Sequence, residues 1–125
     1  MREVAGTGIA RAFGSQVMSW ARFVPAASPA LQVLSDSFGI VSVTRSVAGR
    51  WVVQLAEKAP SFIAIVQPVE NDTTNLHVLQ VESYDYTAGT FQFVHRTAAF
   101  GSLGSLALSD TIDEIWLMTI GRQGL

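Results

Sequence analysis

The chain has 125 residues, the size of one domain and enough to bury an ordinary hydrophobic core. It contains no cysteine, which excludes disulfide bonds and thiol catalysis. Its eight basic and ten acidic residues form no charged block, and no uninterrupted apolar stretch opens the sequence. We therefore expect no nucleic-acid binding, no signal peptide and no membrane span.

Residues 1–30 differ from the rest of the chain, since they are rich in Gly, Ala and Ser and contain Pro25 and Pro29. This composition disfavours continuous regular structure and predicts an extended N-terminal arm, with a candidate first strand at 16–24. Large apolar side chains on such an arm are expected to contact another protein surface. These side chains are Phe13, Met18, Trp20 and Phe23.

From residue 31 onward, short runs rich in Val, Ile, Phe, Trp and Thr alternate with clusters of Gly, Pro, Asn, Asp and Ser. This spacing is typical of an all-β fold, and we predict an antiparallel β-sandwich over 31–125, either jelly-roll or immunoglobulin-like. Together with 16–24 it would have seven or eight strands. The other predicted strands lie at 31–34, 40–47, 50–57, 62–69, 77–86, 90–98 and 114–121.

Two hairpins are predicted within this domain. In the first, Val41 and Val43 share one face of their strand, and Trp51 lies on the core face of the next strand. Gly49 is placed in the turn because glycine adopts a positive φ at little cost. In the second hairpin, the turn is expected to end at Gly89.

The sequence offers few candidates for chemistry. His77 and His95 are 18 residues apart on strands predicted to be adjacent, with no cysteine and few nearby carboxylates to complete a zinc site, so we interpret them as ordinary strand histidines. Asp110, Asp113 and Glu114 are the densest carboxylates but lack the glycine-bearing spacing of a calcium loop. They are interpreted as a polar connection before the last strand. We predict no catalytic residue, no cofactor and no functional metal, and therefore no enzyme.

Charged residues make up 14% of the chain, whereas an ordinary soluble domain has about 25%. Because 49% of the residues are hydrophobic, this shortage is not explained by a small core. Surfaces depleted of charge are typical of protein association. We expect a homo-oligomer, and the alternative is a neutral monomer with a surface rich in Ser, Thr and Gln.

The stretch FGIVSVTRSVAGRWVVQLAEKAPSFIAIVQPVE, residues 38–70, resembles small β-sandwich modules of tailed-bacteriophage virion proteins. Such modules occur in capsid decoration (cement) proteins and in tail fibres. The motifs TAGTFQFV and DEIWLMTIG look like the penultimate and final strands of that family. The family usually has Tyr or Phe where Trp51 stands. The resemblance implies a virion structural role, often as a trimer, and no catalytic residues.

The resulting hypothesis is a capsid decoration protein on the virion surface, made in the host cytoplasm. Its expected partners are further copies of itself, as a homotrimer or dimer, and the major capsid protein. One alternative is a tail-fibre or receptor-binding module of a phage, which would present exposed aromatic residues in its loops. Another is a carbohydrate-binding domain, which requires Trp20, Trp51 and Trp116 to share an exposed face.

Overall fold

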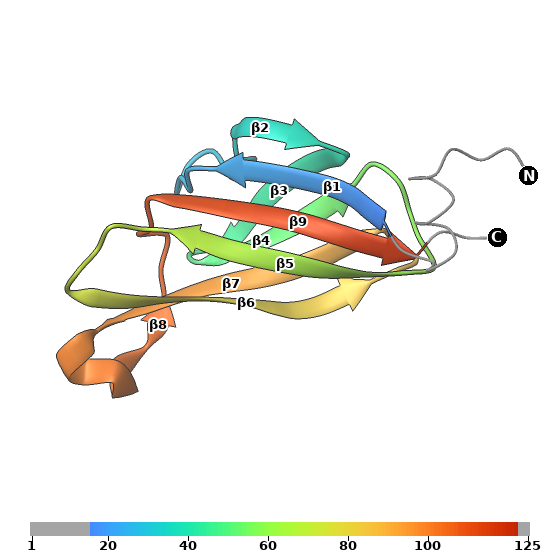
Figure 1. The fold of residues 1–125 in the computed structure, drawn as a ribbon. Helices are drawn as coiled ribbons and strands as arrows, with labels where there is room; N and C mark the ends of the chain where they lie inside the picture. The colour runs from blue at the N-terminus through green and yellow to red at the C-terminus, as the bar shows by residue number, and fades with distance from the viewer. Residues whose placement is uncertain (1–15, 123–125) are drawn as a thin grey trace, which may run out of the picture.

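The computed structural model describes residues 16–122, which form two antiparallel β-sheets packed face to face (Figure 1). One sheet has the strand order β2-β1-β9-β5, and the other has the order β3-β4-β7-β6 with β8 paired to β7. This arrangement confirms the predicted all-β sandwich. The strands are β1 (Gln16–Phe23), β2 (Leu34–Phe38), β3 (Ile40–Val47), β4 (Arg50–Leu55), β5 (Ser61–Val69), β6 (Asn75–Asp85), β7 (Thr90–Ala99), β8 (Ala107–Leu108) and β9 (Glu114–Arg122).

The first strand is an integral part of the sandwich. β1 lies between β2 and β9, and its inward residues Ser19, Ala21 and Phe23 are all buried. Ser19 hydrogen-bonds to Thr119 of the neighbouring strand β9, and Ala21 and Phe23 belong to the core. The candidate strand at 16–24 is therefore present, but the chain from residue 16 does not lie outside the fold as an arm. Residues 1–15 fall outside the described part.

The strand predicted at 31–34 is displaced. Leu31 forms only an isolated bridge with Thr44, and the strand itself begins at Leu34. Buried Gln32 explains the difference, because its side-chain amide accepts a hydrogen bond from the backbone N–H of Ala26 (2.8 Å) and donates one to the carbonyl of Ala30 (3.0 Å). These contacts hold residues 26–32 in a compact loop.

Both predicted hairpin turns are confirmed at their glycines. Gly49 and Gly89 each have a φ of 72°. The prediction that Val41 and Val43 share one face of β3 is wrong, because the register of β3 against β4 shifts between Ile40 and Ser42. This irregularity leaves Val41 exposed while Val43 is fully buried.

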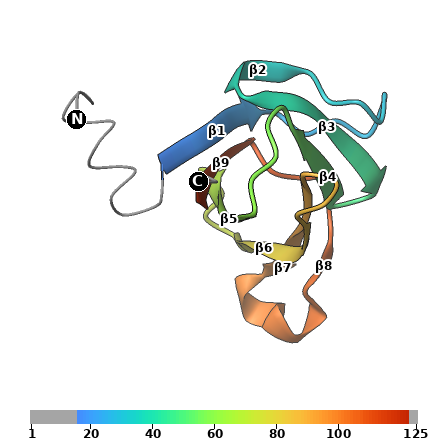
Figure 2. The ribbon, with the colours of Figure 1, turned by 90° about the vertical axis from the view of Figure 1, so that its right-hand side faces the viewer.

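Aromatic rings fill the space between the sheets. Trp51 and Phe93 stack with ring centroids 5.4 Å apart, and Phe23 meets Trp51 edge-on at 5.9 Å. Each large aromatic ring removes about 150–250 Å² from water, so this trio supplies much of the packing between the two sheets. Figure 2 looks along the strands and shows the two sheets facing each other.

The segment after β7 was not predicted. β7 pairs with β4 along Thr90–Val94 and with β8 at Arg96 and Thr97, so β8 continues the line of β4. Between β7 and β8 the chain makes a short 3₁₀ segment, η1 (Phe100–Ser105), which projects from the sandwich (Figures 1 and 2). Its run of small and apolar residues has neither a strand nor a helix period, which is why sequence patterning missed it.

Candidate functional site

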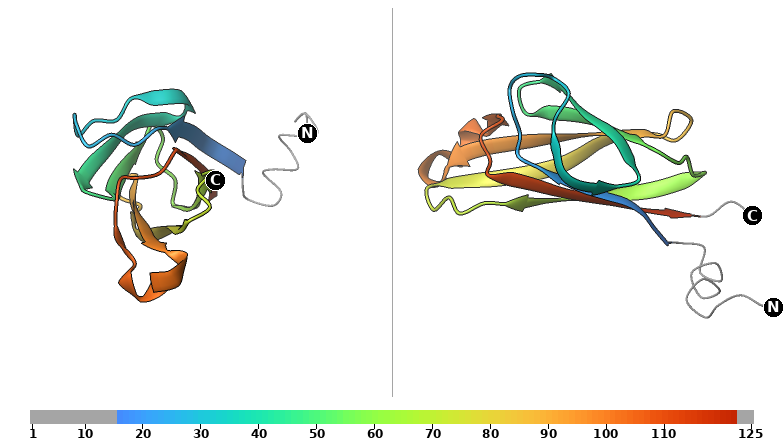
Figure 3. Two further views of the ribbon diagram at one scale, coloured as in Figure 1. Left: turned by 90° about the vertical axis from the view of Figure 1, so that its left-hand side faces the viewer. Right: turned by 90° about the horizontal axis from the view of Figure 1, so that it is seen from above.

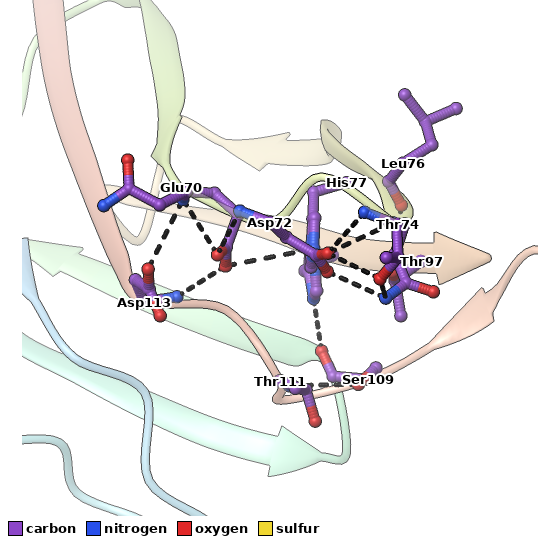
Figure 4. Close-up of polar contacts among 12 residues, drawn as sticks. Glu70, Asp72, Thr74, Leu76, His77, Thr97, Ser109, Thr111 and Asp113 are labelled. Atoms are coloured by element: carbon purple, nitrogen blue, oxygen red, sulfur yellow. Dashed lines mark hydrogen bonds and ion pairs between the residues drawn. The ribbon is translucent and has the colours of Figure 1, made fainter. Parts of the chain in front are cut away.

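Two histidines from neighbouring strands form a hydrogen-bonded pair next to the loop between β5 and β6 (Figure 4). Nδ1 of His77 lies 2.8 Å from Nε2 of His95, and the two rings are stacked. Nε2 of His77 lies 2.9 Å from Oδ2 of Asp72, and Nδ1 of His95 lies 2.5 Å from the carbonyl oxygen of Ser109. We call these four residues the histidine clasp.

The hydrogen-bond partners of the clasp indicate which ring nitrogens donate. The carbonyl oxygen of Ser109 and the carboxylate of Asp72 only accept, so Nδ1 of His95 and Nε2 of His77 each carry a proton. The contact between the rings joins the two remaining ring nitrogens, Nδ1 of His77 and Nε2 of His95. The pair faces the carboxylates of Asp72 and Glu70.

Every ring nitrogen of the clasp is engaged inside the protein. Burial lowers the pKa of His95, which is completely inaccessible. The hydrogen bond from His77, supported by the N–H of Thr74, lowers the pKa of Asp72 and keeps its carboxylate ionised. Within residues 16–122, no group of three His, Asp or Glu side chains is arranged to hold a metal ion.

The clasp ties two loops to the strands β6 and β7. Besides His77, the carboxylate of Asp72 accepts hydrogen bonds from the N–H of Thr74 (2.8 Å) and from the amide of Asn75 (2.8 Å). Glu70 accepts from the N–H of Asp113 at 2.8 Å, which joins the β5–β6 loop to the segment before β9 (Figure 4). The histidines were predicted on adjacent strands, but their contact was not predicted.

The three carboxylates before β9 point to different partners. Asp110 accepts from Nε of Arg45 (2.9 Å), whereas Glu114 accepts from Arg22 (3.3 Å) and from the indole N–H of Trp116 (2.7 Å). Together with the exposed Asp113, they form no acid/base pair. They occupy a connection and the first residue of β9, as the sequence indicated.

A broad apolar surface covers the solvent side of the sheet β2-β1-β9-β5, and we call it the outer face. Register places Trp20 beside Met118 and Phe38, and Met118 beside Ile65. In β1, β5 and β9 these side chains point away from the core, since the alternate positions of the same strands are buried or half-buried, and Phe38 in β2 is 61% exposed. The large apolar residues of the outer face are Val17, Trp20, Phe38, Ile63, Ile65, Val69, Trp116, Met118 and Ile120.

The outer face contains a groove of about 590 Å³. Trp20, Ile65, Val69, Trp116 and Met118 supply most of its lining, and Gln67 is the polar lining residue. The indole of Trp116 is held in place from two sides, by its hydrogen bond to Glu114 and by the guanidinium of Arg22, 5.7 Å from the ring centroid. The groove is therefore preformed and almost entirely apolar.

No family model, curated protein or solved structure matches this chain. The described part of the chain contains no helix long and apolar enough to cross a membrane.

The predicted contact residues are distributed over different environments. Trp20 lines the groove, and Met18 is half-buried against the core. Phe23 is fully buried in the centre of its own sandwich, so it is a core residue and not an arm contact. Phe13 lies outside the described residues.

Sequence reasoning missed Ile65 and the lining role of Trp116. The available signal was the run FIAIV in β5, which is apolar on both faces of the strand. A strand with two apolar faces is typical of burial on both sides. Here Phe62 packs in the core while Ile63 and Ile65 remain exposed. The second apolar face of β5 therefore belongs to the outer face.

Proposed function

We propose that this chain is a structural protein of a bacteriophage virion, a capsid decoration protein that acts through protein–protein contact. The observation that carries the association is the apolar outer face with its groove, formed by β1, β5 and β9. A contiguous apolar patch of this kind marks an interaction surface. Its assignment to a virion is supported by the resemblance of residues 38–70 to phage β-modules.

The mechanism is burial of area by a rigid, chemically inert module. An oligomer that engages several neighbouring capsid subunits binds by avidity even where each contact is weak, and the shell becomes harder to burst. The low charge content supports this mechanism, because few charged groups must be desolvated when the surfaces meet.

The carbohydrate-binding alternative has one observation in its favour, since Trp20 and Trp116 line the same groove. A sugar, however, needs hydrogen-bond partners around its ring as well as an aromatic platform, and Gln67 is the polar side chain of the lining. An apolar protein segment satisfies this groove better. The tail-fibre alternative needs exposed aromatic residues in the loops after Val69 and Ala98, and Phe100 in η1 is the single one that the sequence places there, which counts against this alternative.

Copy number in purified particles tests the proposal. Quantitative mass spectrometry is expected to find hundreds of copies per particle, whereas a handful would indicate a tail module and overturn the capsid assignment. Titration with oligosaccharides, followed by tryptophan fluorescence, is expected to leave the emission unchanged. A saturable change that is lost in Trp116→Ala would favour the carbohydrate-binding alternative.

An outer-face variant tests the surface itself. Ile65 is 42% exposed, so Ile65→Asp is expected to fold normally while particle occupancy falls about tenfold or more. Ser83→Asp, at an exposed position of β6 in the other sheet, is the matched control. Equal occupancy of both variants would contradict the assignment of the outer face.

A further inference from the structure

The segment 100–106, which we call the finger, is an uncharged projection between β7 and β8. No charged residue occurs from Thr97 to Ser109, and no residue of η1 is buried. Its large side chains are exposed, with Phe100 at 53%, Leu103 at 46% and Leu106 at 39% of full accessibility. Such a cluster of apolar side chains at a projecting tip is an unpartnered contact surface.

The finger is anchored firmly at its base. Thr97 pairs with Ala107, and the N–H of Phe100 donates to the carbonyl of Thr74 at 3.1 Å. Within the finger, the hydroxyl of Ser105 donates to the carbonyl of Ser102 at 2.7 Å. The histidine clasp holds the chain just after β8 through Ser109. A projection that is ordered before binding loses little conformational entropy when it binds.

The finger and the groove lie on different sides of the molecule. The finger extends from β7 and β8, whereas the groove is formed by β1, β5 and β9 (Figures 2 and 3). One chain therefore cannot place its finger in its own groove. Both surfaces are nonetheless apolar and nearly free of charge, and neither is covered within the described fold.

We propose that the finger of one copy inserts into the outer-face groove of a second copy. This rests on the proposed function and names the contact through which the subunits associate. The groove of about 590 Å³ falls in the range of about 300–1,000 Å³ typical of ligand clefts, so it accommodates a few large side chains. Leu103, near the tip, and Phe100 supply the apolar surface that meets Trp116 and Ile65.

The geometry of this contact predicts how assembly proceeds. Because two different surfaces meet, the interface is heterologous, and repetition closes a ring when the rotation between neighbours allows it. A trimer is such a ring. A face-to-face dimer of two outer faces, in contrast, would leave Phe100, Leu103 and Leu106 in water.

Complementation between two variants tests the proposal. Leu103→Asp disables the finger and Ile65→Asp disables the groove, and each variant alone is expected to be monomeric by light scattering. Mixed together they retain one intact finger and one intact groove, so a dimer and no larger species is expected. Ser83→Asp, at an exposed position away from both surfaces, should assemble like the unmodified chain.

Engineered cysteines give a second, direct measurement, since the chain has none of its own. A mixture of Leu103→Cys and Gln67→Cys is expected to form a disulfide-linked dimer under mild oxidation. A mixture of Leu103→Cys and Ser83→Cys should not form one. Absence of the first crosslink, or equal yields from both mixtures, would overturn the proposal.

The outcomes separate this inference from the proposed function. If Leu103→Asp still assembles while Ile65→Asp does not, the finger is not the occupant and the inference fails, but association through the outer face stands. If the unmodified chain is monomeric at every concentration, the inference fails as well. Absence of the protein from purified particles would instead contradict the proposed function.

Discussion

Gly49 lies in the β3–β4 turn and contacts the histidine clasp. Its N–H donates to Oδ1 of Asp110 at 2.7 Å, and its carbonyl accepts from the N–H of His95 at 2.8 Å. A Cβ at this position would lie 2.5 Å from the backbone nitrogen of Ser109. Both the positive φ and the lack of space therefore require glycine.

Gly49→Ala is expected to destabilise the fold strongly. The left-handed conformation alone costs a residue with a Cβ about 1–2 kcal/mol, and the backbone clash adds to this. Gly104→Ala in the finger is the control, because a Cβ at that position would have no atom within 4 Å, and its effect should stay within about 0.5 kcal/mol. Similar urea midpoints for the two variants would contradict the prediction.

His95 is expected to make stability depend on pH. Burial lowers the pKa of His95, so below about pH 6.5 the unfolded chain takes up a proton that the folded chain does not. The unfolded state then binds more protons, and the free energy of unfolding falls as the pH falls. The lowered pKa values of Asp72 and Asp110 extend this loss below about pH 4.

Urea unfolding between pH 8 and pH 5 measures this dependence. His95→Gln should be less stable overall, but its stability should change less between about pH 6.5 and pH 5, since the residue with the lowered pKa is gone. A variant whose stability falls as steeply as that of the unmodified chain would show that other groups are responsible.

At the scale of the elements, Asp110 links the β3–β4 hairpin to the segment before β9. It accepts a charge-assisted hydrogen bond from Arg45 at 2.9 Å and a backbone hydrogen bond from Gly49 at 2.7 Å. These elements are about 60 residues apart in the chain, so no short connection holds them together. The side chain therefore fixes the end of the hairpin against the second half of the domain.

Asp110→Ala is expected to lower the free energy of unfolding by about 2 kcal/mol, because it leaves a half-buried guanidinium and a backbone N–H without their partner. The control is Glu82→Ala, which removes a surface ion-pair partner of Arg50 and Arg96 but leaves no backbone N–H without an acceptor, so its cost should be smaller. Chemical denaturation of both variants measures the two free energies of unfolding. An equal loss in the two variants would contradict a special role for Asp110.

At the scale of the whole molecule, two apolar surfaces dominate the exterior, the outer face and the finger. Both are formed by residues that the fold exposes although their types favour burial. Among the described residues, several charged groups lie in ion pairs, such as Arg50 with Glu82 and Arg22 with Glu114.

Self-association should therefore resist salt. Light scattering at micromolar concentration is expected to show an oligomer both at low salt and at about 1 M NaCl, where ionic contacts are screened over about 3 Å. Apolar burial does not weaken under these conditions. Dissociation by salt would show that ion pairs, and not the apolar surfaces, hold the subunits together.

The sequence by itself determined the local features of this protein. Alternation of residue types placed most of the strands, and it put Trp51 on the core face of β4. Gly49 and Gly89 marked the hairpin turns, because a positive φ is a property of one residue and its immediate neighbours. The small number of charges was also visible without a structure.

Only the tertiary structure decided which faces remain open and which side chains meet. Alternation cannot tell which face of β5 is buried, since both are apolar, and it cannot detect the register shift that exposes Val41. The groove exists because β9 pairs with both β1 and β5, which brings Trp20, Ile65 and Met118 together from distant parts of the chain. The His77–His95 contact likewise depends on the register of β6 and β7. Such contacts follow from strand pairing over long sequence separations, so a local residue pattern cannot predict them.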